Sequence, residues 1–264
     1  MLIDSHAHIY DEQYGENGAL SIVNSMGSDG LEAIVTVGCD IDSSVKCAEL
    51  AENNERIFAA VGVHPYYPQT VTPRTIGVLR DLAACEKTVA IGEFGFDYHR
   101  DGFDKAAQNA AVVMQYDLAR ELRLPMVFHI RDGWGDFYEF SKNRDFPESG
   151  VMHCFSGSKE SAEYCLAKGL YISFGGKLTY RNSKRLAEVA AAVPLDRVLI
   201  ETDAPYLAPS KVFGQTNYPK YVAYVRDKLA EIKGVPAQEI ERATTENAKR
   251  LFFRMNRSSA ANNG

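Results

Sequence analysis

The sequence predicts a single (β/α)₈ barrel, in which eight parallel strands alternate with helices. Its 264 residues match the length of about 250 that is usual for this fold. Eight short apolar segments recur along the chain, and most are continuously apolar, as strands covered by helices on both faces usually are. Residues able to bind metals stand at the carboxyl ends of most of these segments. The third observation favours a barrel over an open doubly wound sheet, which would scatter those ends.

We expect the eight strands at residues 2–8, 31–38, 57–64, 88–93, 125–130, 150–154, 169–174 and 197–202. Helical periodicity is clearest at 105–122, where an apolar stripe runs from Ala107 to Leu122 and Pro125 follows the helix. Further helices are expected at 43–53, 72–84, 159–168, 183–192, 219–232 and 236–253. We expect residues 1–255 to form one domain and 256–264, rich in Ser, Ala, Asn and Gly, to be a disordered C-terminal tail.

The composition excludes several classes of protein. A hydrophobic content of 45% with 24% charged residues supports a buried core and is unlike that of a disordered chain. The net charge of −6 argues against a broad basic surface that tracks phosphates, so any nucleic acid must be bound locally. Five cysteines without a CxxC pair are typical of a reducing compartment, and no apolar run approaches the ~18 residues of a membrane span. We expect a cytoplasmic monomer with no membrane partner.

Five of the six histidines and two carboxylates stand at strand ends, which meet at one mouth in a barrel. These residues are His6, His8, His64, Glu93, His129, His153 and Asp203. His6 and His8, two positions apart on one strand, point to the same face and can bind one divalent ion. A single buried histidine is usually a hydrogen-bonded core residue, but this many buried polar groups together require a compensating cation.

The number of candidate ligands predicts two divalent ions, because a four-coordinate ion uses fewer groups than are present. In binuclear hydrolytic sites a carboxylate can bridge the two ions, and Glu93 is the candidate for that role. Histidine and carboxylate ligands suit Zn²⁺, Mn²⁺ or iron, and Mg²⁺ fits a weakly held second site. We expect Asp4 to have a structural role. We expect Cys154 to pack in the core, because adjacent strand positions point to opposite faces.

The chain resembles the TatD-like family of metal-dependent deoxyribonucleases in the amidohydrolase superfamily. The motifs that carry the resemblance are DSHAH (4–8), GVHP (62–65), IGEFGFDYHR (91–100), VFHIRD (127–132), HCFSGS (153–158), ISFGG (172–176) and ETDAPYLAP (201–209). The resemblance implies one ion on His6, His8, Glu93 and Asp203, and a second ion on Glu93, His129 and His153. It also implies a place near the substrate for His64, and motif positions around the mouth for Asp97, Arg131 and Ser156. Asp97 and Ser156 are equally compatible with capping of the loops and helices that follow them.

One segment departs from the family pattern. The family commonly has a basic stretch after the ETDAPYLAP motif, whereas residues 210–219 here read SKVFGQTNYP and keep only Lys211 as a cation. Contacts to phosphate from this loop are therefore fewer than the resemblance implies.

The preferred hypothesis is a hydrolase of the 3′-5′ exonuclease type that acts on single-stranded DNA ends. Asp203 would orient the attacking water and accept its proton, with Glu93 as the other catalytic carboxylate. A flanking phosphate is expected at Arg131, Lys211 or His99, and bases could stack on Tyr66, Phe96 or Tyr98 or these rings could simply pack the loops. The alternatives are an amide or ester hydrolase, such as an aminoacyl-tRNA deacylase, and a binding protein whose metals are structural.

Overall fold

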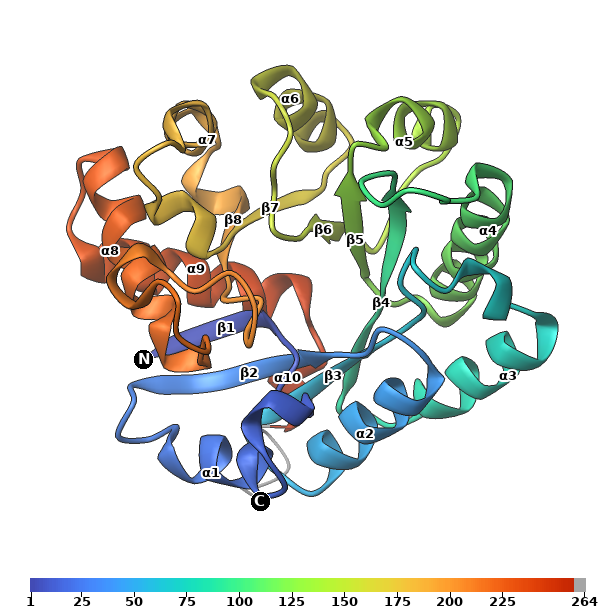
Figure 1. Ribbon diagram of the computed structural model, residues 1–264, viewed down its shortest axis with the longest axis horizontal. Coiled ribbons are helices and arrows are strands. Elements are labelled where there is room, and N and C mark those ends of the chain that lie inside the picture. The colour runs from blue at the N-terminus through green and yellow to red at the C-terminus, as the bar shows by residue number, and fades with distance from the viewer. Residues whose placement is uncertain (259–264) are drawn as a thin grey trace.

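The computed structural model describes residues 1–258 and has a single sheet of eight parallel strands in the order β1 to β8. The strands are β1 (Leu2–Ala7), β2 (Leu31–Val37), β3 (Ile57–Val61), β4 (Thr88–Asp97), β5 (Met126–Arg131), β6 (Gly150–Met152), β7 (Tyr171–Phe174) and β8 (Val198–Ile200). Helices surround this ring of strands (Figure 1). The predicted (β/α)₈ barrel is therefore confirmed.

The helices follow the strands in alternation. They are α1 (Gly18–Ser25), α2 (Ile41–Glu52), α3 (Pro73–Leu82), α4 (Lys105–Leu122), α5 (Trp134–Ser141), α6 (Lys159–Ala167), α7 (Lys184–Ala192), α8 (Val222–Lys233), α9 (Ala237–Leu251) and α10 (Met255–Ser258). Helix α4 has the predicted bounds, with Asp104 capping its start through Ala107 N and Arg123 ending it at φ 53°. Within residues 1–258, no helix is both long and apolar enough to cross a membrane.

Besides the four-residue α10, two helices, α1 and α5, have no counterpart among the predicted helices. Each has only eight residues, and neither has a side chain that caps its first turn. Helix α5 is also rich in aromatic residues, which favour strands. By contrast, α2 begins with a capping box between Asp40 and Ser43, which marks a helix start in the sequence.

The barrel closes between β1 and β8, next to the predicted metal-binding residues. Ala7 pairs with Ala204 in a parallel bridge, and His8 N donates to Ala204 O at 2.7 Å. Thr202 donates from both its backbone N and its hydroxyl to the fully buried carboxylate of Asp4. Asp4 therefore has the structural role expected of it, because it ties the first strand to the segment after the last.

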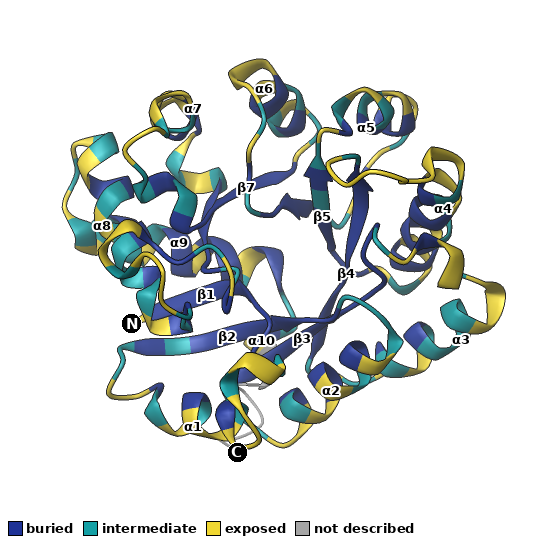
Figure 2. Cartoon of the chain, viewed as in Figure 1, coloured by how far each residue is buried: buried dark blue, intermediate teal, exposed yellow. Residues whose placement is uncertain are grey.

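The interior of the barrel is filled by one face of every strand. Residues from all eight strands pack in a single cluster together with Ala248 and Leu251 of α9, Phe252 directly after α9, and Met255 of α10. Because these α9 and α10 residues meet the early part of the strands, they cover the amino end of the barrel. The other strand faces pack against the outer helices, whose exposed sides face away from the strands (Figure 2). The carboxyl end is left for polar side chains.

The C-terminal segment differs from expectation where it can be described. The predicted disordered tail, 256–264, begins inside α10, and its residues 259–264 lie outside the described part of the chain.

Candidate metal centre

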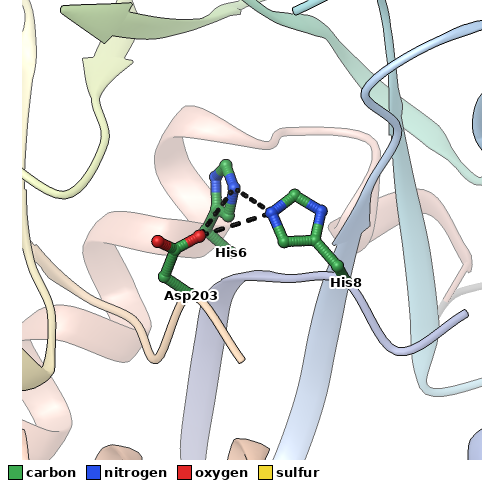
Figure 3. A group of neighbouring side chains, drawn as sticks. All are labelled: His6, His8 and Asp203. Atoms are coloured by element: carbon green, nitrogen blue, oxygen red, sulfur yellow. Dashed lines mark hydrogen bonds and ion pairs between the residues drawn. The ribbon is translucent and has the colours of Figure 1, made fainter. Parts of the chain in front are cut away.

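The first group of site residues comes from β1 and the turn after β8. Nε2 of His6 lies 3.3 Å from Nε2 of His8, so the two rings converge as their spacing predicted. Asp203 Oδ1 lies 3.7 Å from His6 Nε2 and 3.3 Å from His8 Nε2 (Figure 3). Asp203 is held in place because its N donates to His6 O at 2.9 Å and its φ of 57° turns the chain toward the mouth. These three side chains form one group able to hold an ion.

Glu93 lies between two sets of histidines and presents a different oxygen to each. Oε1 lies 3.8 Å from His6 Nε2 and 3.7 Å from His8 Nε2. Oε2 lies 3.3 Å from His129 Nδ1 and 2.8 Å from His153 Nε2. The side chain is buried within β4, which continues four residues beyond the predicted end at Glu93. Glu93 therefore has the position required of a bridging carboxylate.

Acceptors behind two of the histidines fix which ring nitrogen faces the centre. His8 Nδ1 lies 2.7 Å from the carbonyl oxygen of Val37, and His129 Nε2 lies 2.9 Å from Asp97 Oδ2. In a neutral ring the nitrogen that donates to such an acceptor carries the proton, which leaves a lone pair on the other nitrogen. These lone pairs are on His8 Nε2 and His129 Nδ1, the atoms that face Glu93.

His153 has a carboxylate behind it as well. Its Nδ1 lies 3.4 Å from Oε1 of the buried Glu201, which also accepts a hydrogen bond from Cys154 N at 2.6 Å. Strand β6 ends at Met152, and Cys154 has a φ of 42°. The strand alternation assumed for Cys154 therefore does not apply, and this cysteine belongs to neither hydrophobic cluster among the described residues.

The electrostatics of the site keep Glu93 ionised and His64 neutral. Burial would raise the pKa of Glu93, but the positive charge that His153 carries lowers that pKa well below its usual value. Burial would likewise raise the pKa of Asp97, yet the hydrogen bonds from His129 and His99 N lower it to about 2. Burial lowers the pKa of His64 to about 3, and the neighbouring His129 adds to that effect.

The nitrogen and oxygen atoms of the centre are arranged better for binding divalent ions than for hydrogen bonding to one another. His6 Nδ1 and Glu93 Oε2 are buried without a hydrogen-bond partner, and the 2.8 Å approach of Oε2 to His153 Nε2 lacks hydrogen-bond geometry. His129 Nδ1 and His153 Nε2 lie only 2.9 Å apart. Two ring nitrogens this close need either a proton or a metal ion between them. Among residues 1–258, the sets of three donors within 4.8 Å of one another are His6, His8 and Asp203; His6, Glu93 and His153; His8, Cys39 and Glu93; and His64, Glu93 and His129.

His64 lies beside the second set and offers a proton rather than a lone pair. Tyr66 N donates to His64 Nδ1 at 3.1 Å, so the neutral ring carries its proton on Nε2. The ring packs edge-on against His129 with centroids 4.4 Å apart. His64 is therefore placed to donate a hydrogen bond at the mouth.

The three cations proposed for substrate contact have different surroundings in the structure. Arg131 ends β5 at the mouth, and its side chain makes no ion pair within the described part of the chain. Lys211 is exposed and lies over the ring of Tyr224 on α8, 4.7 Å from its centroid. His99 pairs with Asp132 at 3.1 Å. Of these three cations, Arg131 is thus the one without an ion pair or ring contact among residues 1–258.

The structure corrects the roles expected of Phe96 and Ser156. Phe96 is fully buried, so it packs the core and cannot stack on a base, whereas Tyr66 and Tyr98 are partly exposed. Ser158 caps α6 by accepting a hydrogen bond from Ser161 N, so the capping role considered for Ser156 belongs to Ser158. Asp97 combines both roles considered for it, because it accepts from the loop at His99 N and from His129.

Sequence reasoning missed Glu201 and Cys39. Glu201 precedes the catalytic candidate Asp203 in the ETD motif, and its motif position was the available signal. Cys39 follows the second predicted strand and is 54 positions from Glu93 in the chain, so only the folded structure brings the two together.

A (β/α)₈ barrel whose mouth gathers histidines and carboxylates in metal-binding groups is the architecture of a metal-dependent hydrolase. The chain belongs to the TatD family: the model described as TatD related DNase matches residues 3–253. The uncharacterized metal-dependent hydrolase YabD of Bacillus subtilis (strain 168) is 41% identical over 253 residues, 96% of this chain and 99% of the relative.

Two further relatives are informative. The 3′-5′ ssDNA/RNA exonuclease TatD of Enterobacter lignolyticus (strain SCF1) is 33% identical over 229 residues, 84% of this chain and 88% of the relative. The crystal structure of YJJV, a TatD homologue from Escherichia coli K12, superposes with a TM-score of 0.90 at 30% identity, covering 96% of this chain and 98% of that one. The protein is a metal-dependent hydrolase of the TatD family.

Proposed function

We propose that this hydrolase cleaves phosphodiester bonds at single-stranded DNA ends, as a 3′-5′ exonuclease with a binuclear metal centre. The observation that carries the proposal is the position of Glu93, whose two oxygens face two separate histidine sets. Two ions a few ångströms apart are the usual means of holding both the attacking and the leaving oxygen of a phosphodiester. The name of the Enterobacter relative, a ssDNA/RNA exonuclease, supports a nucleic-acid substrate.

The residues would divide the two ions between them. His6, His8, Asp203 and Glu93 Oε1 would hold one ion, and Glu93 Oε2, His129 and His153 the other. Zn²⁺, Mn²⁺ or Mg²⁺ at such a centre lowers the pKa of water toward neutrality and neutralises charge on the attacked phosphorus. The imidazole-rich ligand sets favour Zn²⁺ or Mn²⁺.

The protein's own groups then position the substrate and move the proton. The Asp203 side chain is 14% exposed, the most open of the carboxylates facing His6 and His8. With Oδ1 on the histidines, its Oδ2 is left to orient the attacking water and accept its proton. Neutral His64 donates from Nε2 to a phosphoryl oxygen, and Arg131 binds the flanking phosphate. Lys211 binds a more distant phosphate if its ammonium leaves the Tyr224 ring.

The first test is hydrolysis of 5′- and 3′-labelled single-stranded DNA by chelator-treated protein, with Mg²⁺, Mn²⁺ or Zn²⁺ restored in turn. We expect metal-dependent shortening from the 3′ end. Asp203→Asn should lose about 10²- to 10⁴-fold in rate, the usual contribution of a general base. Asp132→Asn, which changes an exposed carboxylate in the loop after β5, is the matched control and should keep its rate.

Salt dependence separates this function from its alternative. Cleavage of DNA should weaken steeply with added salt, and Arg131→Ala should reduce the slope of that dependence by about one charge. Protein that binds metal but leaves DNA intact under all conditions would contradict the proposal. Ester and amide substrates, including aminoacyl-tRNA, would then be the ones to assay.

A further inference from the structure

Cys39 brings a thiol to the metal centre from a strand that supplies no other donor. It follows β2 by two residues, and its backbone is fixed on both sides: Cys39 N donates to Ser43 Oγ, and Cys39 O accepts from His64 N, both at 2.9 Å. Its position is therefore set by the first turn of α2 and by the segment after β3.

The thiol faces the same carboxylate oxygen as the first pair of histidines. Cys39 Sγ lies 3.4 Å from Glu93 Oε1 and 3.8 Å from Nδ1 of His8. Glu93 Oε1 in turn lies 3.7 Å from His8 Nε2. His8, Cys39 and Glu93 thus form a group of three donors within 4.8 Å of one another.

The other cysteines are placed differently. Cys47 is buried against Thr36, and Cys165 is buried in the outer hydrophobic cluster. Cys85 lies just before β4, at the opposite end of the barrel from the mouth. Among residues 1–258, Cys39 is the cysteine that belongs to a metal-binding group.

We propose that Cys39 is a sulfur ligand of the ion held by His8 and Glu93, and that it makes this centre select thiophilic divalent ions such as Zn²⁺ or Co²⁺ over Mg²⁺ and Mn²⁺. The inference rests on the metal centre of the proposed function but not on its substrate. When the sulfur–metal bond forms, the S–H bond breaks and its proton passes to solvent, with no change of oxidation state. Thiolate ligands select softer ions, whereas carboxylate and water ligands suit Mg²⁺ and Mn²⁺.

Cobalt substitution tests the bond directly, without any substrate. Co²⁺ added to chelator-treated protein should give a thiolate-to-cobalt charge-transfer band in the near ultraviolet, and Cys39→Ser and Cys39→Ala should lose it. Cys85→Ser, a partly exposed cysteine far from the centre, and Cys154→Ser should keep the band. Competition titrations should show the preference for Zn²⁺ over Mn²⁺ falling about tenfold or more in both Cys39 variants.

The outcomes separate the sulfur ligand from the metal centre itself. Cobalt that binds without the band, or a band lost in Cys154→Ser and kept in Cys39→Ser, overturns the sulfur ligand and leaves the proposed function standing. A protein that binds no cobalt overturns both. Conversely, a band that depends on Cys39 in a protein inactive on DNA supports the ligand and contradicts the nuclease function.

A second measurement uses the unaltered protein and does not depend on a variant folding. Partly exposed Cys39 should react with N-ethylmaleimide in metal-free and Mg²⁺-treated protein, as read by peptide mass spectrometry. Zn²⁺ should protect Cys39 and leave Cys85 reactive. Equal labelling of Cys39 with Zn²⁺ and with Mg²⁺ would overturn the proposal.

Discussion

Replacing Asp97 by Asn should weaken the ion on the His129 side of the centre without unfolding the barrel. The Asp97 carboxylate is buried and accepts two hydrogen bonds at 2.9 Å, from His129 Nε2 and from His99 N. An Asn side chain has one oxygen, so it can accept from only one of these donors while its NH₂ group faces the other. The most damaging outcome is a flip of the His129 tautomer, which would put a proton on Nδ1 and remove the lone pair that faces Glu93.

The size of the effect follows from these contacts. A buried donor left without a partner costs about 1–3 kcal/mol. Loss of an outer partner of a metal-binding histidine typically costs about 10- to 100-fold in metal affinity, or about 1.4–2.7 kcal/mol. The two ranges overlap, so we expect a 10- to 100-fold weaker second ion and little change in the ion on His6, His8 and Asp203.

The assay is the number of ions bound per chain and their affinities, measured by equilibrium dialysis with elemental analysis and by competition titration. Asp132→Asn is the matched control, because Asp132 also contacts a histidine, His99, but is exposed and lies outside the metal-binding groups. Wild-type stoichiometry and affinity in Asp97→Asn would refute the assignment of the His129 tautomer.

Three further predictions concern Glu93, His64 and Thr202. Glu93→Gln should reduce the occupancy of both ions, since one side chain faces both histidine sets; elemental analysis checks this, and loss of one ion alone would contradict bridging. In metal-free protein, the pKa of His64 is about 3 when folded and about 6.5 when unfolded, so only the unfolded state takes up a proton between these values and stability falls as the pH drops. In urea unfolding, the stability of His64→Gln should fall by about 2 kcal/mol less than that of the wild type between pH 7 and pH 5, and equal falls would disprove the pKa shift. Thr202→Val should destabilise the barrel by about 1–3 kcal/mol in urea by removing a donor to buried Asp4, while Thr202→Ser should not; a neutral Thr202→Val would show that the closure does not depend on this hydrogen bond.

The sequence alone determined the barrel and most of the candidate metal ligands. Continuous apolar runs are required of strands buried on both faces, and polar residues at their ends must meet wherever such strands close into a ring. For this reason the positions of His6, His8, Glu93 and Asp203 could be predicted without coordinates. Helices with strong local signals, such as α4 and its cap at Asp104, were equally accessible.

Only the tertiary structure decided which groups contact the far side of those candidate ligands. Cys39 and Glu93 are 54 positions apart, and Glu201 and Cys154 are 47 apart, and no local pattern links members of such pairs. The direction of each imidazole likewise depends on an acceptor from another strand, as His129 depends on Asp97. Periodicity specifies which face a side chain is on, but hydrogen-bond partners and tautomers are set by distances between strands, which exist only once the barrel has closed.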